Sequence, residues 1–297
     1  MKKIFIFFMC IVTQFYCIYG ESYSEIINKA KTRKFNYTQF YDFDNEYDFL
    51  VHKYDESKKI NYNKKKMNEL FINTFMKIIP FRKIKMLRTE VTQELYKAVM
   101  NENPSYFFDN PLNGEIQQKR PVDSVSWYDA IYFCNSLSEI FLLTPVYSVN
   151  GETDVTQWNY VPHKGNVLEG KIEQNLKANG YRLPTVEEWQ YAARGGQNFN
   201  YAGSNYRDEV AWNLDNSNYK THAVGIKKSN GYGLYDMSGN VKEWCWDSNN
   251  NYYYNYRYNC GGSWSSNADD CLVAFPDDDD AKYQVNYIGF RIVCSAE

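Results

Sequence analysis

The sequence predicts a loop-rich domain that mixes helices with short strands. Aromatic residues make up 18% of the chain, with 28 Tyr and 7 Trp, which favours packing through rings over an aliphatic α/β sheet. Three segments carry helix-start signals, and residues 197–297 alternate short aromatic runs with Asn, Asp, Gly and Ser turns. These observations indicate an α+β domain with little regular secondary structure.

The first 20 residues predict a secretory signal peptide. A basic start at residues 1–3 precedes an almost wholly apolar run at 4–19 and the small residue Gly20. The apolar run is short for a membrane span, which needs about 20 residues. A retained anchor or a lipid on Cys17 is the alternative. We expect an exported protein, whether secreted, periplasmic or at the cell surface, with membrane contact only through an uncleaved or lipidated N-terminus.

The charge balance excludes one class of partner. Net charge is −3, from 33 basic and 36 acidic residues, and no basic stripe runs along the chain. A nucleic-acid-binding protein needs a positive field, so we expect no nucleic-acid partner.

Composition changes along the chain. Residues 21–69 are rich in Lys, Tyr, Asn and Asp, lack a clear period and predict a polar N-terminal extension. The domain is expected over residues 70–297. Its first strands are predicted at residues 75–80, which end in a proline, and at residues 83–87.

Capping residues predict three helices within the domain. Thr92 can cap the first helix. Either Asp123 or Ser126 can cap the second, whose apolar residues repeat at helical spacing. Thr185 and Glu188 form the pattern of a capping box for the third.

Six blocks in a fixed order carry a family resemblance. They are TEVTQELYKAVM at 89–100 with NPS at 103–105, PVDSVSW at 121–127, YRLPTVEEWQYAARGG at 181–196, GLYDMSGNVKEW at 233–244, GGSW at 261–264 and IGFR at 288–291. The ordered set resembles the sulfatase-modifying-factor (formylglycine-generating enzyme) family. The resemblance implies a compact α+β domain of C-type-lectin-like topology. Founding members oxidise a sulfatase cysteine to formylglycine with copper and oxygen, and others make sulfur–carbon bonds with iron or do no known chemistry, so the site must decide function.

The catalytic cysteine pair of the founding enzymes is incomplete here. Those enzymes hold copper(I) between two cysteines five residues apart, downstream of the Gly-Gly-Ser block. Counting from Gly261, the later position is Cys271 and the earlier is Ser266. A hydroxyl is a hard donor and a poor substitute for a thiolate on copper(I). We therefore expect no copper and a non-catalytic protein. The alternative is a formylglycine-generating oxidase, or a related metal-dependent oxidoreductase, that uses Cys271 with another partner.

Five cysteines follow the signal peptide, which is an odd number and leaves at least one unpaired. Cys245 and Cys271 are one disulfide candidate, with a free Cys271 thiol as the alternative. The resemblance suggests Cys134 with Cys294 as the second candidate. Cys260 would then be the odd one.

The resemblance also implies one structural calcium. Its ligands here would be the carboxylates of Asp236 and Glu243 and the carbonyl oxygens of Gly239 and Val241, a set of hard oxygen donors. The alternative is that the two carboxylates only cap a turn.

The segment 265–287 lies between the GGSW and IGFR blocks and mixes acidic, hydroxyl and aromatic residues without periodicity. It resembles the variable region of ligand-binding proteins of this fold that are diversified by a retroelement, in which asparagine codons are randomised at their adenines. An ordinary variable, solvated loop is the alternative. The candidate ligand-binding residues, of types reachable from AAC by adenine changes or left unchanged, are Ser265, Ser266, Asn267, Asp269, Asp270, Phe275, Asp277, Asp278, Asp279, Asp280, Tyr283, Val285 and Tyr287.

The negative charge of segment 265–287 limits which classes of partner it can bind. Four consecutive aspartates at 277–280 repel one another and are expected to stay solvated unless a cation or basic partner approaches. Nearby aromatic residues add contact area. We expect an extracellular protein with a cationic patch, or a polar glycan.

Overall fold

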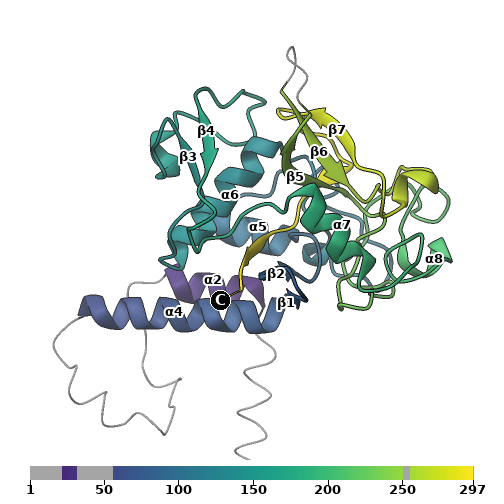
Figure 1. Ribbon diagram of the computed structural model, residues 1–297, viewed down its shortest axis with the longest axis horizontal. Coiled ribbons are helices and arrows are strands. Elements are labelled where there is room, and N and C mark those ends of the chain that lie inside the picture. The colour runs from purple at the N-terminus through teal and green to yellow at the C-terminus, as the bar shows by residue number, and fades with distance from the viewer. Residues whose placement is uncertain (1–21, 32–55, 250–254, 297) are drawn as a thin grey trace, which may run out of the picture.

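The computed structural model describes residues 22–31, 56–249 and 255–296 (Figure 1). The expected signal peptide lies outside these residues. In the part of the chain that is described, no helix is both long and apolar enough to cross a membrane. The α-helices are α2 (Tyr23–Lys31), α4 (Glu56–Phe75), α5 (Gln93–Met100), α6 (Trp127–Ile140), α7 (Val186–Arg194) and α8 (Arg207–Val210). The strands are β1 (Met76–Ile79), β2 (Ile84–Leu87), β3 (Tyr147–Val149), β4 (Ile172–Gln174), β5 (Lys242–Ser248), β6 (Tyr256–Cys260), β7 (Asp277–Asp280), β8 (Ile288–Gly289) and β9 (Val293–Ser295).

The described strands form three small sheets. One has the order β1-β2-β9, one pairs β3 with β4, and the largest has the order β7-β6-β5-β8. All pairings are antiparallel except that of β5 with β8. The two strands predicted at 75–80 and 83–87 are confirmed as β1 and β2. The α+β fold class is also confirmed, because helices and separate short sheets pack around two clusters of buried hydrophobic residues.

The predicted helix starts are present. Thr92, Ser126 and Thr185 cap α5, α6 and α7, and the last two form complete capping boxes. Each cap satisfies backbone N–H groups that have no partner within the helix and stabilises by about 1 kcal/mol. Of the two candidates for α6 it is Ser126 that caps. Asp123 instead accepts a hydrogen bond of 2.7 Å from the Tyr106 N–H.

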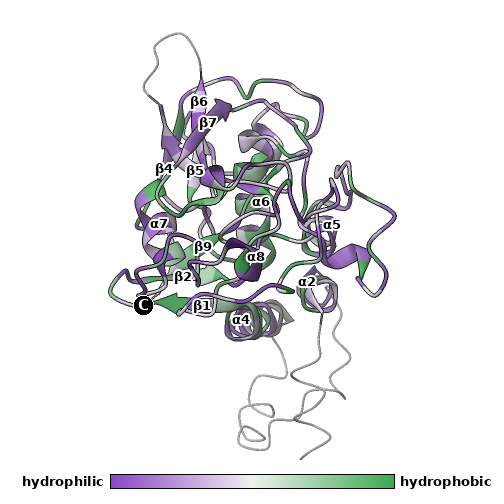
Figure 2. Ribbon diagram, turned by 90° about the vertical axis from the view of Figure 1, so that its right-hand side faces the viewer, coloured by the Kyte–Doolittle hydropathy of each residue, from purple (hydrophilic) through white to green (hydrophobic). Residues whose placement is uncertain are grey.

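Part of the expected polar extension belongs to the core. Helix α4 runs through residue 70, the expected start of the domain, and leads directly into β1. Helix α2 buries Ile26, Ile27 and Ala30, and the Tyr23 ring stacks on Phe75 at 3.9 Å. Figures 1 and 2 show the two helices side by side along one edge of the domain. The spacing of these apolar residues gives α2 one buried face despite its polar composition.

Aromatic side chains fill the interior, as the composition predicts. Trp127, Trp189 and Trp244 are all less than 2% exposed. Trp127 begins α6, which crosses the apolar centre of the molecule (Figure 2), and its indole N–H donates to the Cys245 carbonyl at 2.9 Å. The Trp244 indole donates in turn to the Val125 carbonyl at 2.9 Å. These two bonds join α6 to β5 and so fix the sheet that carries loop 265–287.

Candidate functional site

Loop 265–287 is held at both ends. On its N-terminal side, Gly262 has φ +69°, and a Cβ there would lie 2.8 Å from the Cys271 Sγ, so only glycine fits this turn. On its C-terminal side, β8 pairs with β5. The Trp264 indole N–H donates to the Asn286 carbonyl at 2.9 Å and ties the two ends together. The loop is therefore presented on a fixed base.

The two positions that correspond to the copper cysteines lie at this base. Ser266 is 7% exposed, and its Oγ accepts a hydrogen bond of 3.0 Å from the Ser263 N–H. Cys271 is fully buried under Gly262, and burial raises the pKa of its thiol to about 12. The donors are thus one hydroxyl engaged within the turn and one thiol that is protonated at neutral pH. This pair does not fit a copper(I) ion, which requires soft thiolates.

The surroundings of the cysteines bear on the two candidate disulfides, which stay predictions. All five cysteines of the described residues are buried free thiols. Cys271 lies against Gly262, and the Cys294 Sγ contacts the Met76 Sδ at 3.9 Å. Neither Cys245–Cys271 nor Cys134–Cys294 is therefore bonded in this structure. Sequence spacing alone could not place these side chains, because their positions depend on how the strands pair.

The two predicted calcium carboxylates have different surroundings. The Glu243 carboxylate accepts two bonds of 2.5 Å from the Arg291 guanidinium and one of 2.6 Å from the Trp189 indole. Asp236 is 2% exposed and accepts a 2.7 Å bond from the Gly225 N–H, while its Oδ1 is buried without a partner. Burial raises the pKa of Asp236 to about 6.

The two predicted carbonyl ligands lie on the buried segment that leads into β5. Gly239 donates its N–H to the Gly261 carbonyl at 2.7 Å, and Val241 is fully buried. Within the described residues, no group of three or more acidic, His or Cys side chains is arranged to hold a metal. Because Arg291 already occupies Glu243, calcium at this point stays a prediction that depends chiefly on Asp236.

Sequence reasoning missed Glu90 in this region. Its side chain is fully buried, and both carboxylate oxygens lack a hydrogen-bond partner. Burial raises the pKa of Glu90 well above its usual value, and the nearby carboxylates of Asp236 and Glu243 raise it further. The residue lies in the first of the six family blocks, but nothing in its local pattern distinguishes it from a surface glutamate. Only the tertiary fold brings it toward Arg291.

Most of the predicted ligand-binding residues reach the surface. Six are exposed and six are half-buried; Ser266 is the exception and is buried. Phe275 and Tyr283 are 63% and 42% exposed, which is high for rings of this size. The loop therefore offers a surface of acidic, polar and aromatic side chains, with Ser266 beneath it. The exposed residues are Asn267, Asp269, Asp270, Phe275, Asp277 and Tyr283, and the half-buried ones are Ser265, Asp278, Asp279, Asp280, Val285 and Tyr287.

The four aspartates do not form a solvated run as expected. They make up the edge strand β7, which pairs with β6 and turns alternate side chains to opposite faces. This alternation separates neighbouring charges and reduces their repulsion. Each carboxylate also has a protein partner: Lys242 for Asp277, Asn249 for Asp278, Asn259 for Asp279 and Lys282 for Asp280.

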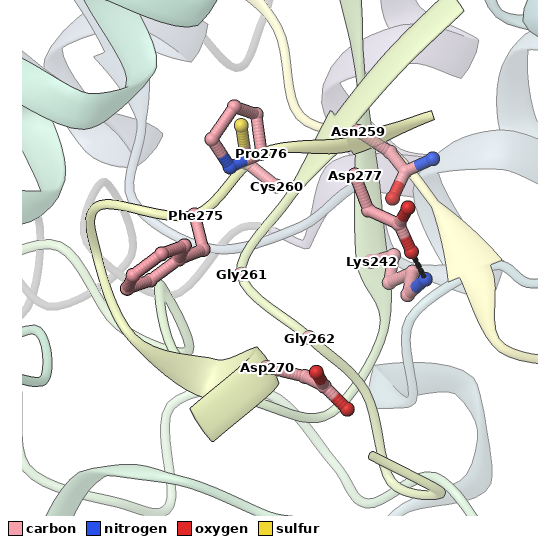
Figure 3. Close-up of a pocket in the computed structure, with 9 residues that line it drawn as sticks. All are labelled: Lys242, Asn259, Cys260, Gly261, Gly262, Asp270, Phe275, Pro276 and Asp277. Atoms are coloured by element: carbon pink, nitrogen blue, oxygen red, sulfur yellow. Dashed lines mark hydrogen bonds and ion pairs between the residues drawn. The ribbon is translucent and has the colours of Figure 1, made fainter. Parts of the chain in front are cut away.

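A small pocket of about 210 Å³ opens beside β7 (Figure 3). The carboxylates of Asp270 and Asp277 and the ring of Phe275 lie around it. Asn259 also lines it, and the Asn259 Oδ1 is buried without a hydrogen-bond partner. Lys242 also lines the pocket and pairs with Asp277, so the pocket combines the remaining negative charge of Asp270 with an apolar ring. Its full lining is Lys242, Asn259, Cys260, Gly261, Gly262, Asp270, Phe275, Pro276 and Asp277.

Exposed aromatic side chains from other segments border the base of the loop. Tyr106 and Tyr219 are 64% and 71% exposed. Phe107, next to Tyr106 in the chain, packs its ring edge-on against Trp264 at 5.3 Å. Beside Tyr219, the Ser217 hydroxyl donates to the Trp264 carbonyl at 2.8 Å. The sequence did not predict these two exposed rings. The aromatic run at residues 106–108 could have indicated Tyr106, whereas Tyr219 stands alone among polar residues.

Comparison with known proteins decides the family. Residues 55–296 match the sulfatase-modifying factor enzyme 1-like domain (FGE-sulfatase). The chain belongs to this family. Among its relatives, chaperone protein LppX of Paenibacillus barcinonensis is 39% identical over 230 residues, which is 69% of this chain and 78% of the relative.

Two solved structures of similar fold agree with the family assignment. Treponema denticola variable protein 1 has a TM-score of 0.66 and 36% identity, over 74% of this chain and 91% of that one. CarF has a TM-score of 0.60 and 32% identity, over 72% and 87%. The family resemblance based on the six blocks is thereby confirmed, and so is the similarity to a variable protein that segment 265–287 suggested.

Proposed function

We propose that this FGE-sulfatase family member is an exported, non-catalytic protein that binds a ligand through loop 265–287. The observation that carries the proposal is Ser266, which stands where the oxidase needs a thiolate and is hydrogen-bonded to Ser263. Its companion Cys271 is a buried, protonated thiol. The side chains around this inert pair face solvent, which suits display better than chemistry. Similarity to Treponema denticola variable protein 1 supports the idea that the side chains of this loop vary.

The ligand is a protein that inserts a Lys or Arg side chain into the pocket beside β7. At about 210 Å³, the pocket is smaller than the 300–1,000 Å³ typical of small-molecule sites, so it suits one side chain. An aliphatic stem can pack on Phe275, and the cationic head can meet Asp270. Exposed Tyr106 and Tyr219, whose chain neighbours contact Trp264 at the base of the loop, are candidates for further contacts.

The binding experiment uses poly-L-lysine as the probe and poly-L-glutamate as the negative control. Wild-type protein is immobilised, and binding is followed by biolayer interferometry at about 50 and 300 mM NaCl. We expect binding of poly-L-lysine that weakens with salt, because charge pairs at a surface are screened.

Asp270→Asn tests the pocket, and Asp269→Asn is its matched control. Both side chains are exposed and adjacent, but only Asp270 lines the pocket. Asp270→Asn should lose binding several-fold, by roughly the 1 kcal/mol of an exposed charge pair or more, while Asp269→Asn should lose less. Equal losses would argue against the pocket. Salt-independent binding to a neutral oligosaccharide array, with none to poly-L-lysine, would favour the glycan alternative.

The oxidase alternative has a direct test. Protein loaded with copper is incubated with a sulfatase-motif peptide under oxygen, and aldehyde is sought by mass spectrometry. We expect none. Turnover that disappears in Cys271→Ser would overturn the non-catalytic proposal.

Export and diversification are separate parts of the proposal. Export predicts that the protein recovered outside the cytoplasm has lost residues 1–20, which N-terminal sequencing can check. Diversification predicts a template copy of the codons for loop 265–287, differing at adenines, with a reverse transcriptase gene nearby. A neighbourhood without either would remove diversification and leave ligand binding untouched.

A further inference from the structure

Two thiols lie side by side behind the pocket. The Sγ atoms of Cys245 on β5 and Cys260 at the end of β6 are 3.8 Å apart. The two strands are antiparallel neighbours; Cys260 is opposite Glu243, and Cys245 lies two residues further along β5, where the register shifts between Trp244 and Ser248. The side chains are 0% and 2% exposed. A disulfide requires about 2.05 Å between the sulfurs, so side-chain rotation and a small shift of the two strands must close the remaining gap when the bond forms.

The other cysteines have different neighbours. Cys271 lies under the Gly262 turn, and Cys294 contacts Met76. The pair is also not part of any larger group of His, Cys or acidic side chains fit for a metal within the described residues. The arrangement therefore suits a covalent bond between the two sulfurs better than a metal site.

We propose that Cys245 and Cys260 form a disulfide when the chain folds in an oxidising compartment. The bond joins positions 15 residues apart and closes the connection between β5 and β6. It lies immediately before the Gly261–Gly262 turn, from which loop 265–287 departs. The strands beneath the loop are then held together whatever side chains the loop carries.

The reaction is thiol–disulfide exchange with a disulfide oxidant. The Cys260 thiolate attacks a sulfur of the oxidant, giving a mixed disulfide and one released thiol. The Cys245 thiolate then attacks the Cys260 sulfur and releases the second thiol. Two protons leave the cysteines, and two electrons reduce the oxidant's S–S bond to two thiols. Cys260 reacts first because it lines the pocket, whereas burial raises the pKa of the Cys245 thiol, so the bond forms most readily during folding.

The inference depends on the proposed export in one respect: in the cell, an oxidising compartment would supply the oxidant. The test is therefore done in vitro, where oxidised glutathione supplies it. The chain without residues 1–20 is refolded with oxidised and reduced glutathione, then alkylated with iodoacetamide in denaturant. Of its five cysteines, three should be alkylated before reduction and all five after it. Peptide mapping should recover the segments around Cys245 and Cys260 as one linked species. Alkylation of all five without reduction would overturn the proposal.

Two variants distinguish this bond from the alternatives. Cys271→Ser should keep the linked species, whereas a bond between Cys245 and Cys271 would disappear in it. Cys260→Ser should abolish the link. The oxidised wild type should melt roughly 6–12 °C above the reduced protein, as expected for closing a loop of about 15 residues. An equal redox shift in Cys260→Ser would count against the assignment.

Discussion

Replacing Arg291 with methionine should be among the most destabilising single changes in the domain. Arg291 is fully buried, and Glu243, its partner, is likewise fully buried. Two guanidinium N–H groups reach the carboxylate at 2.5 Å each, and others reach the carbonyls of Leu87 and Tyr235 at 3.2 and 3.0 Å. One cation thus joins β2, the segment before β5, β5 itself and the IGFR block.

The magnitude follows from what the methionine leaves behind. Breaking a buried ion pair by removing one partner costs about 3–5 kcal/mol, since the other charge stays uncompensated. Two carbonyls also lose a donor, at about 1 kcal/mol each. The nearby carboxylates of Glu90 and Asp236 lose an attractive charge as well. We expect a total loss of roughly 5 kcal/mol, a large part of a typical stability of 5–15 kcal/mol.

Urea unfolding followed by tryptophan fluorescence measures this loss. Arg82→Met is the control, because Arg82 pairs with Glu187 at the surface and should cost under about 1 kcal/mol. The double variant Arg291→Met/Glu243→Gln should recover part of the loss, since it removes the stranded charge and keeps an acceptor for Trp189. A loss below about 1 kcal/mol in Arg291→Met would refute the reasoning. A double variant as unstable as the single one would assign the loss to packing instead of charge.

Three further outcomes are expected. If calcium binds through Asp236, a concentration 100 times its Kd should add about 2.7 kcal/mol to the free energy of unfolding; a melting midpoint unaffected by chelator would contradict this. Burial raises the pKa of Asp123 to about 6 from 3.8, so the folded state binds the proton more tightly and stability should fall as pH rises from about 4 to 6. In urea titrations, Asp123→Asn should reduce the decrease in the free energy of unfolding over this pH range by roughly 3 kcal/mol. An Asp123→Asn variant whose stability depends on pH as the wild type's does would count against the raised pKa. Ser266→Cys, which restores a thiol beside Cys271, should bind copper(I) at least about tenfold more tightly than wild type in a chelator competition, and equal affinities would exclude a latent site.

Features that depend on local chemistry were predictable. The caps at Ser126 and Thr185 need only residues within one helical turn, and both form as predicted. The order of the six blocks located the base of the loop and the Ser266 substitution. The caps depend on contacts within one helical turn, and the Ser266 substitution depends on a count of a few residues from Gly261.

Features that depend on strand pairing were not predictable. Consecutive aspartates have poor strand propensity, yet β7 forms because β6 supplies a backbone partner and Lys242 supplies a counter-charge. The contact between Cys245 and Cys260 depends on the register of β5 against β6, which includes a bulge. Helix α2 has too few apolar residues for its sequence to predict burial. It is buried because α4 and α5 pack against its apolar face.

The way in which the domain holds loop 265–287 explains how its side chains can vary. The anchoring bonds use loop main-chain atoms: the carbonyls of Ala281, Val285, Asn286 and Tyr287 accept from Trp127, Ser124, Trp264 and Lys242. A backbone carbonyl is present whatever the side chain, so substitution of the exposed residues of the loop leaves these anchors in place. Surface substitutions of this kind usually change stability by no more than about 0.5 kcal/mol. Ser266 differs because its side chain is buried and bonds Ser263. We therefore expect a library randomised over the exposed residues to remain folded, while randomising Ser266 should unfold a measurable share of clones in a thermal-melt screen.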